Sequence, residues 1–213
     1  MQSRLTTPLS RADVEALAAR LSDDERARAR QFVFDDDRRD YIAAHALLWE
    51  MLDAHYPEMR GPFLLQRGSN GKPFIPTSAA LPYPPSFNLS HARGLVACGV
   101  LQTSAAARNV SVGVDVEVIR AFDHQADIAA EYFSPLERES LAQLPMDSPQ
   151  WLERFFDVWT LREARGKALG LGLSLPPEDD RSAWTFFQTA PTPDTRLAVA
   201  VNAPAANIYY ARG

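Results

Sequence analysis

The stretch Val112-Gly113-Val114-Asp115-Val116-Glu117-Val118 decides the fold of the second half of this chain. Valines occupy every second position, and a glycine and two carboxylates occupy the positions between them. Successive side chains of a β-strand point to opposite faces, so this period of two predicts a strand with an apolar face in the core. Asp115 and Glu117 then lie side by side on the other face.

The paired carboxylates have two interpretations. Two carboxylates held together on a rigid strand repel each other unless a cation lies between them, and hard oxygen ligands of this kind suit magnesium. A simple solvated strand face is the other interpretation. Asp115 and Glu117 alone do not distinguish a metal site from such a face.

A helix predicted over residues 150–169 carries a second polar pair. Glu163 and Lys167 lie one turn apart and therefore share a helix face. The pair is either a surface ion pair or one edge of a cleft. As a cleft edge, it would supply a third carboxylate and a cation to Asp115 and Glu117.

The remaining elements come in clusters. Helices are predicted from Ser10 to about Leu21, after the Ser22 and Glu25 capping box, and from near Asp35. Residues 62–85 read as a loop with short extended pieces, and strands follow at 87–91 and 95–101. Short helices at 126–132 and 135–144 precede the long helix, and the tail has strand-like runs at 184–187, 197–201 and 208–210. This clustering favours an α+β fold over a regularly alternating parallel sheet, with a boundary that divides the chain into residues 1–105 and 106–213.

Composition excludes several classes of protein. The chain has 213 residues and a net charge of −5, which argues against a nucleic-acid backbone as its main partner. The longest apolar run, about residues 95–101, is too short to cross a membrane, and the N-terminus has no secretory apolar region. We therefore expect a cytoplasmic protein that binds neither nucleic acid nor membrane. We also expect it to be a monomer. The single cysteine, Cys98, is expected in the core.

Two further residues could meet a ligand. Lys72 follows the Asn70-Gly71 turn and precedes Pro73, which favours an extended backbone. His91 ends a predicted strand just before a tight turn at Arg93 and Gly94, where side chains reach ligand or solvent. Each residue alone is more often structural.

Taken in order, six short motifs resemble the Sfp-type 4′-phosphopantetheinyl transferases. The first two are weakly specific, whereas the last four in this order are a strong match. The motifs are Asp-Glu-Arg-Ala-Arg at 24–28, Arg-Arg-Asp-Tyr-Ile-Ala-Ala-His at 38–45, Gly-Lys-Pro at 71–73, Phe-Asn-Leu-Ser-His at 87–91, Gly-Val-Asp-Val-Glu at 113–117 and Trp-Thr-Leu-Arg-Glu-Ala-Arg-Gly-Lys-Ala at 159–168.

The resemblance implies an α+β fold of two pseudo-symmetric halves, each with a helix packed on a small antiparallel sheet, and an active site in the cleft between them. It implies transfer of 4′-phosphopantetheine from coenzyme A to a serine of an apo acyl- or peptidyl-carrier protein, which docks near residues 133–144. The residues implied are Asp115, Glu117 and Glu163 for Mg²⁺, Gly71, Lys72, Pro73, Ser90 and His91 with Arg28 and Arg39 for coenzyme A, and Glu163 and Lys167 for catalysis.

Two positions depart from the family pattern. Arg162 stands where the family usually has lysine, and Asp40 interrupts a run that is often all basic. Asp40 leaves open which arginine reaches the 3′-phosphate of coenzyme A.

Two other functions compete with the transferase. A metal-dependent phosphodiesterase or nuclease would explain the carboxylates and little else. A coenzyme A-binding module without turnover would not need Glu163 and Lys167.

Overall fold

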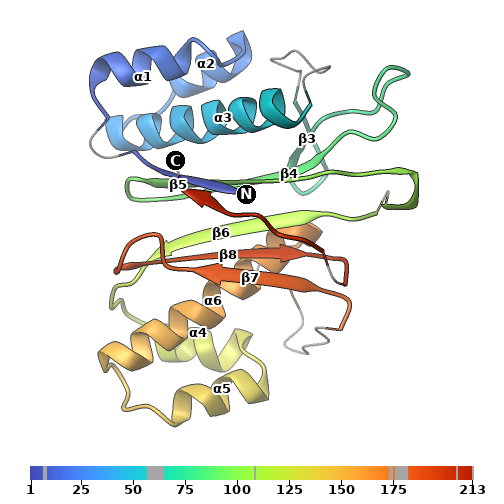
Figure 1. Cartoon of the computed structure of the whole chain (residues 1–213). Coiled ribbons are helices and arrows are strands. Elements are labelled where there is room, and N and C mark those ends of the chain that lie inside the picture. The colour runs from blue at the N-terminus through green and yellow to red at the C-terminus, as the bar shows by residue number, and fades with distance from the viewer. Residues whose placement is uncertain are drawn as a thin grey trace.

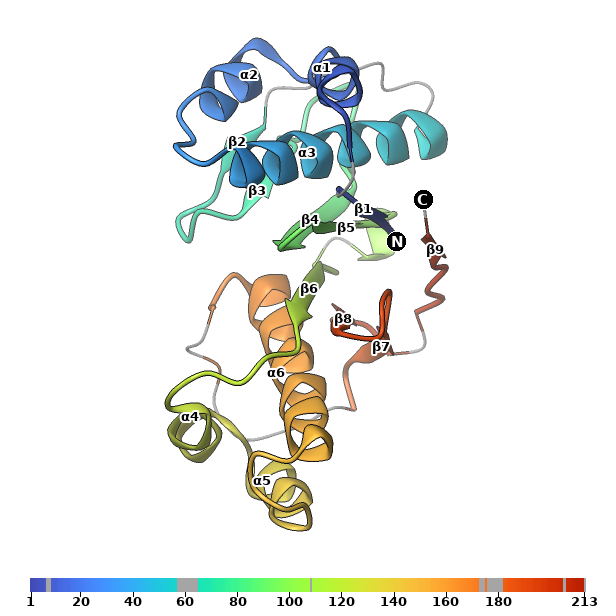
Figure 2. The same ribbon diagram turned by 90° about the vertical axis from the view of Figure 1, so that its left-hand side faces the viewer.

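The computed structural model describes residues 1–6, 9–56, 65–107, 109–172, 175, 182–204 and 206–212. Helices and small sheets are stacked in layers, as Figures 1 and 2 show. The predicted α+β class is confirmed. The part of the predicted loop before residue 65 lies outside the described residues.

The first sheet has the strand order β4-β5-β1-β9 and lies beneath helix α3 (Figure 1). Strands β4 and β5 form an antiparallel hairpin, in which Ser86 pairs with Leu101 and Ala92 with Leu95. The elements of this part of the chain are β1 (Gln2–Leu5), α1 (Arg11–Ala18), α2 (Asp23–Ala29), α3 (Asp35–His55), β2 (Gln66–Arg67), β3 (Pro73–Phe74), β4 (Ser86–Ala92), β5 (Leu95–Leu101) and a 3₁₀ turn, η1 (Ala105–Ala107).

The second sheet has the antiparallel order β6-β8-β7, and α6 packs against β6 and β8. Helices α4 and α5 lie at the far end of α6 from the first sheet (Figure 2). The elements are β6 (Val112–Val118), α4 (Gln125–Tyr132), α5 (Pro135–Ala142), α6 (Pro149–Leu169), β7 (Thr185–Thr189), β8 (Thr195–Val201) and β9 (Ala211–Arg212).

Strand β5 separates two hydrophobic cores because its alternate residues face opposite ways. Val96 and Cys98 pack with the apolar face of α3, whereas Leu95 and Ala97 pack with the valines of β6 and β8. The expectation that Cys98 is a core residue is confirmed. Burial raises the pKa of its thiol well above the ordinary value.

Helix α1 ends earlier than the sequence predicted. It stops at Ala18 instead of continuing to about Leu21. Ser22 is the N-cap of α2 and has an extended backbone, with φ −65° and ψ 165°, so the chain must leave helical geometry before it. Leu21 is instead buried with Ala29 and Ile42.

The two ends of the chain meet at the edge of the first sheet, which the sequence did not predict. Strand β1 pairs antiparallel with β5 and parallel with β9. The strand predicted at 208–210 was wrong by position, because the strand β9 begins at Ala211, whose N–H donates to Met1 O. Before it, the Met1 amino group donates to Tyr209 O at 2.8 Å. Tyr210 instead joins the sheet through its hydroxyl, which lies 2.8 Å from Ser3 Oγ.

None of the helices in the described part of the chain is both long and apolar enough to cross a membrane.

Candidate active site

Gly113 allows α6 to lie directly against β6. A Cβ atom at this position would come within 1.8 Å of Ala164 O, so any side chain would push the helix away. Asp115 and Glu117 lie on the same face of β6 as Gly113 and therefore face α6 instead of open solvent. This close approach brings the helix that carries Glu163 and Lys167 to the two carboxylates.

A buried polar cluster joins three elements at the seam between the sheets. Lys167 Nζ lies 2.5 Å from Asp115 Oδ1 and donates to Ser90 Oγ at 3.1 Å. Ser90 Oγ also lies 3.3 Å from Asp115 Oδ1. Asp115 is only 2% exposed, so the simple solvated face considered from the sequence does not describe this carboxylate. Residues of β4, β6 and α6 are therefore in direct contact here.

The carboxylates around this cluster hold their protons more tightly than usual. Burial, and then the charge of Asp115, raise the pKa of Glu117 to about 7, against partial lowering by a hydrogen bond from Trp159 and by the charge of Lys167. Burial and Asp115 also raise the pKa of Glu163. Burial raises the pKa of Asp115 itself, and its ion pair with Lys167 opposes that change. A cation would relieve this mutual repulsion.

The metal-ligand arrangement is incomplete in the structure. In the described part of the chain, no three His, Cys, Asp or Glu side chains are grouped closely enough to hold a metal ion together. One observation nevertheless fits a cation: Asp115 Oδ2 is buried and has no hydrogen-bond partner among the described residues. A buried carboxylate oxygen without a partner is costly, and a cation would satisfy it.

Side chains of β4 hold the outer edge of β6 in place. Among the described strands, β6 lies at the edge of its sheet and pairs with β8 alone, so every second N–H group points away from the sheet. Asn88 Oδ1 accepts a hydrogen bond from Val114 N at 2.8 Å, and Ser90 Oγ accepts one from Val116 N at 3.2 Å. The sequence did not predict this role for Asn88, although its spacing of two residues from Ser90 matches the period of both strands.

Lys72 also ties the two parts of the chain together. Its ammonium group donates to Val112 O at 2.9 Å and to Ala168 O at 3.0 Å, the latter in the last turn of α6. Burial lowers the pKa of Lys72 to about 8. The ammonium has one remaining N–H group, which could donate a hydrogen bond to a phosphate.

Gly71 and Pro73 shape the turn that carries Lys72. Gly71 has a φ of 78°, a left-handed conformation that glycine adopts without strain. Pro73 starts β3 opposite Arg67, whose guanidinium donates to Gly71 O at 3.0 Å. The turn is exposed and therefore accessible to a ligand.

His91 points away from the buried cluster, because it follows Ser90 on the strand. It is exposed and lines a surface cleft at the start of α3, together with Arg39, Asp40 and Arg93. Arg39 pairs with Asp36 at 2.9 Å, and its Nε atom is buried without a hydrogen-bond partner among the described residues. His91 and Arg39 thus share one cleft.

Arg28 lines a different cleft, together with Glu25, Tyr41, Arg67 and Pro73. The structure therefore does not bring Arg28 and Arg39 into one pocket. Arg67 was not among the predicted site residues. The sequence could have indicated Arg67 as a ligand-binding residue, because it precedes the turn at Asn70 and Gly71 and lies opposite Pro73.

Arg162, which departs from the family pattern, is a buried structural residue. Its guanidinium donates to Glu137 Oε2 at 3.1 Å, which ties α6 to α5.

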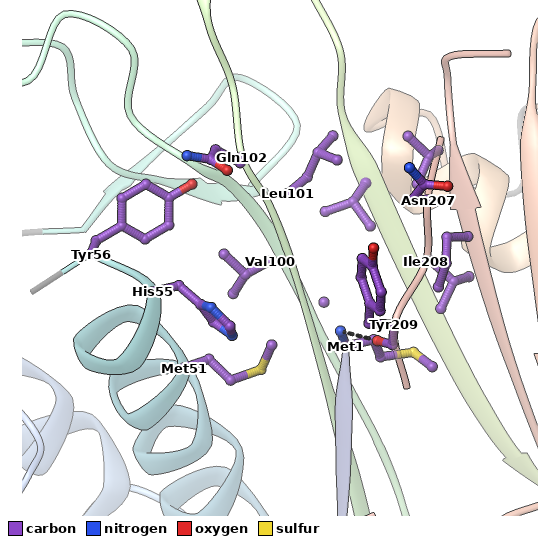
Figure 3. Close-up of a pocket in the computed structure, with 14 residues that line it drawn as sticks. Met1, Met51, His55, Tyr56, Val100, Leu101, Gln102, Asn207, Ile208 and Tyr209 are labelled. Carbon is purple, nitrogen blue, oxygen red and sulfur yellow. Dashed lines mark hydrogen bonds between the residues drawn. The ribbon is translucent and has the colours of Figure 1, made fainter. Parts of the chain in front are cut away.

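Figure 3 shows a further pocket, between the end of α3, strand β5 and the segment 207–209. Its lining includes Met51, His55, Leu101, Ile208 and Tyr209. None of the predicted site residues lines it, so this pocket is not the candidate active site.

Comparisons with known proteins agree with the motifs. Residues 111–212 match the family model of the 4′-phosphopantetheinyl transferase superfamily, and residues 7–101 match that of the 4′-phosphopantetheinyl transferase N-terminal region. The chain is 31% identical over 207 residues to the 4′-phosphopantetheinyl transferase HetI of Nostoc sp., covering 89% of this chain and 82% of the relative. It is 27% identical over 169 residues to the 4′-phosphopantetheinyl transferase Sfp of Bacillus subtilis, covering 79% of this chain and 69% of the relative. A human L-aminoadipate-semialdehyde dehydrogenase-phosphopantetheinyl transferase is 27% identical over 77% of this chain and 53% of its own length.

Proposed function

We propose how this chain, which belongs to the 4′-phosphopantetheinyl transferase superfamily, carries out its reaction. It transfers the 4′-phosphopantetheine arm of coenzyme A to a serine of a carrier protein and releases 3′,5′-ADP. The contact of Asp115, Ser90 and Lys167 is the observation that carries the proposed site. The nuclease alternative has no support from the relatives, which are phosphopantetheinyl transferases.

Asp115, Glu117 and Glu163 would hold a magnesium ion. The free Oδ2 atom of Asp115 and the raised pKa values of Glu117 and Glu163 support this assignment. A bound magnesium ion would neutralise negative charge on the pyrophosphate of coenzyme A. The three carboxylates are not grouped as ligands in the described part of the chain, so binding a magnesium ion would require their side chains to rearrange.

Lys167, Ser90, Lys72 and His91 would bind the phosphates of coenzyme A. Lys167 is partly exposed at the seam and can approach the bridging oxygen on which negative charge develops. Arg39 would join His91 at the 3′-phosphate, since both line one cleft. Gly71 and Pro73, with Arg28 and Arg67 nearby, would border the nucleotide on the exposed turn.

Glu163 would accept the proton of the carrier serine as this hydroxyl attacks the phosphorus next to the pantetheine arm. A carboxylate whose pKa lies above its ordinary value is a better base than a free one. Burial and Asp115 raise the pKa of Glu163 in this direction.

The carrier protein would dock beside α5. Two large apolar side chains are exposed on and just after this helix, Leu136 at 76% and Met146 at 66%, and could contact a carrier protein. We also propose that the enzyme works in the cytoplasm as a monomer, without nucleic acid or membrane partners. Residues 1–105 would bind the phosphates of coenzyme A, and residues 106–213 would bind the metal and carry out catalysis. Its products would serve lipid or secondary-metabolite biosynthesis.

Intact-protein mass spectrometry of an apo carrier protein tests this proposal. Incubation with the enzyme, coenzyme A and magnesium should add one phosphopantetheine arm, and Glu163→Gln should slow the addition by about 100-fold or more. Glu153→Gln is the matched control, since this exposed residue of α6 pairs with Arg196 and lies outside the proposed site. An unmodified carrier protein, or a Glu163→Gln enzyme as fast as its parent, would contradict the assignment.

A further inference from the structure

Asp40, the acidic residue that interrupts the basic run of α3, is buried and makes hydrogen bonds to Thr6 and Gly94. Asp40 is only 3% exposed, although residues 35–38 before it on α3 are exposed. Its Oδ1 accepts a hydrogen bond from Thr6 Oγ1 at 2.5 Å, and its Oδ2 accepts one from Gly94 N at 3.1 Å. Thr6 N in turn donates to Gly94 O at 2.6 Å. The three residues close a ring of hydrogen bonds.

This ring holds the turn of the β4–β5 hairpin. Arg93 and Gly94 form that turn with φ values of 25° and 81°, both on the left-handed side. Arg93 is not a glycine, so its backbone conformation is unfavourable and needs support from its surroundings. Asp40 and Thr6 supply this support at the neighbouring residue.

The two residues of the cleft that are proposed to bind phosphate, His91 and Arg39, lie close to this ring of hydrogen bonds. His91 lies three residues before Gly94 on β4 and lines the same cleft as Asp40. Arg39 is next to Asp40 on α3, and its Nε lies 3.9 Å from Asp40 Oδ1. A hydrogen-bonded and ion-paired buried carboxylate can therefore orient a histidine from the sheet and an arginine from the helix together.

We propose that Asp40 is a positioning residue for coenzyme A binding, which fixes the hairpin so that His91 and Arg39 face one phosphate. This inference rests on the proposed function, because it takes the cleft to be where coenzyme A binds. It explains why a carboxylate can occupy a position in a basic run: Asp40 does not itself meet the phosphate.

Steady-state kinetics of Asp40→Ala test the inference. At saturating carrier protein, we expect the KM for coenzyme A to rise about three- to tenfold, with kcat within about twofold of the parent. The rise should be smaller with dephospho-coenzyme A, which lacks the 3′-phosphate. Amide hydrogen exchange of residues 90–95 should become faster.

Asp40→Asn should restore the slow hydrogen exchange of residues 90–95 and most of the parent KM, since it keeps the ring of hydrogen bonds and loses only the charge beside Arg39. Its amide oxygen can accept from Gly94 N, and its amide nitrogen can donate to Thr6 Oγ1. Asp53→Ala is the control, since Asp53 is an exposed residue of the same helix that pairs with Arg20 and does not line the cleft. If Asp40→Ala does not fold, Thr6→Val removes one bond of the ring and should raise the KM less.

The inference and the proposed function fail in different ways. If His91→Ala leaves the KM for coenzyme A unchanged, the cleft is wrongly assigned. If His91→Ala raises the KM while Asp40→Ala does not, or if Asp40→Asn is as impaired as Asp40→Ala, only the positioning role of Asp40 is overturned.

Discussion

The cluster at the seam and the cleft at the start of α3 hold their charges in opposite ways. At the seam, Asp115 is almost fully buried and is fixed by Lys167 and Ser90. In the cleft, Arg39 pairs with Asp36, an exposed neighbour on its own helix. Arg39 is half-buried and only Asp36 is exposed, and an ion pair with an exposed partner on the same helix contributes little, so Arg39 can exchange Asp36 for a phosphate at low cost. The ion pair of Asp115 is fixed before a ligand binds, whereas the ion pair of Arg39 with Asp36 can be exchanged for one with a phosphate.

The largest effect should come from removing the buried charge. We expect Asp115→Asn, which keeps the shape of the side chain, to lower turnover by about 100- to 1000-fold. Far-ultraviolet circular dichroism should remain unchanged. Chelation of divalent metal by EDTA should stop the parent enzyme. Near-normal turnover in the variant, or in EDTA, would contradict the metal assignment.

A second test compares His91 in the cleft with Lys72 at the seam. His91→Ala should weaken coenzyme A binding by about ten- to a hundredfold and leave the melting temperature unchanged, because His91 is exposed. Lys72→Ala should weaken binding and also lower stability by about 2 kcal/mol, since it removes two hydrogen bonds between the parts of the chain. Calorimetric titration and chemical denaturation measure the two quantities. Equal stability of the two variants would argue against a stabilising role for the hydrogen bonds of Lys72 to Val112 and Ala168.

The third test uses pH to examine the seam. The pKa of Glu117 rises from an ordinary 4.5 to about 7 in the folded chain. The unfolded chain therefore releases this proton first, and stability should fall as the pH rises from about 4.5 to about 7. Glu117→Gln should flatten this fall. Magnesium should raise the melting temperature of the parent more at pH 8 than at pH 5, because metal ligands must be ionised. Equal magnesium effects at both pH values would count against Glu117 as a ligand.

The smallest effects should distinguish the two arginines. Arg39→Ala should raise the KM for coenzyme A about two- to fivefold and Arg28→Ala less, because only Arg39 shares the cleft of His91. The effect of Arg39→Ala should shrink in high salt and with dephospho-coenzyme A. A larger effect for Arg28→Ala would move the 3′-phosphate to the cleft beside Arg67.

Local pattern was sufficient for the elements that carry the site. The alternation at 112–118 correctly predicted β6, and the capping residues Ser22 and Ser134 lie where the sequence placed them. The ordered motifs also pointed to the family, and the comparisons confirmed it. These features depend on neighbours in the sequence, so they can be read without a tertiary structure.

Contacts between distant segments were decided only by the tertiary structure. The sequence showed Asp115 on a polar strand face, but the burial of that face depends on Gly113 admitting α6 at close range. The position of Asp40 appeared as a defect in a basic run, yet its partners Thr6 and Gly94 lie 34 and 54 residues away. Strands β1 and β9 are too short to show a period and exist because each completes the same sheet edge. Long-range pairing of this kind leaves no local pattern, because the energy that selects it comes from packing and hydrogen bonds between segments.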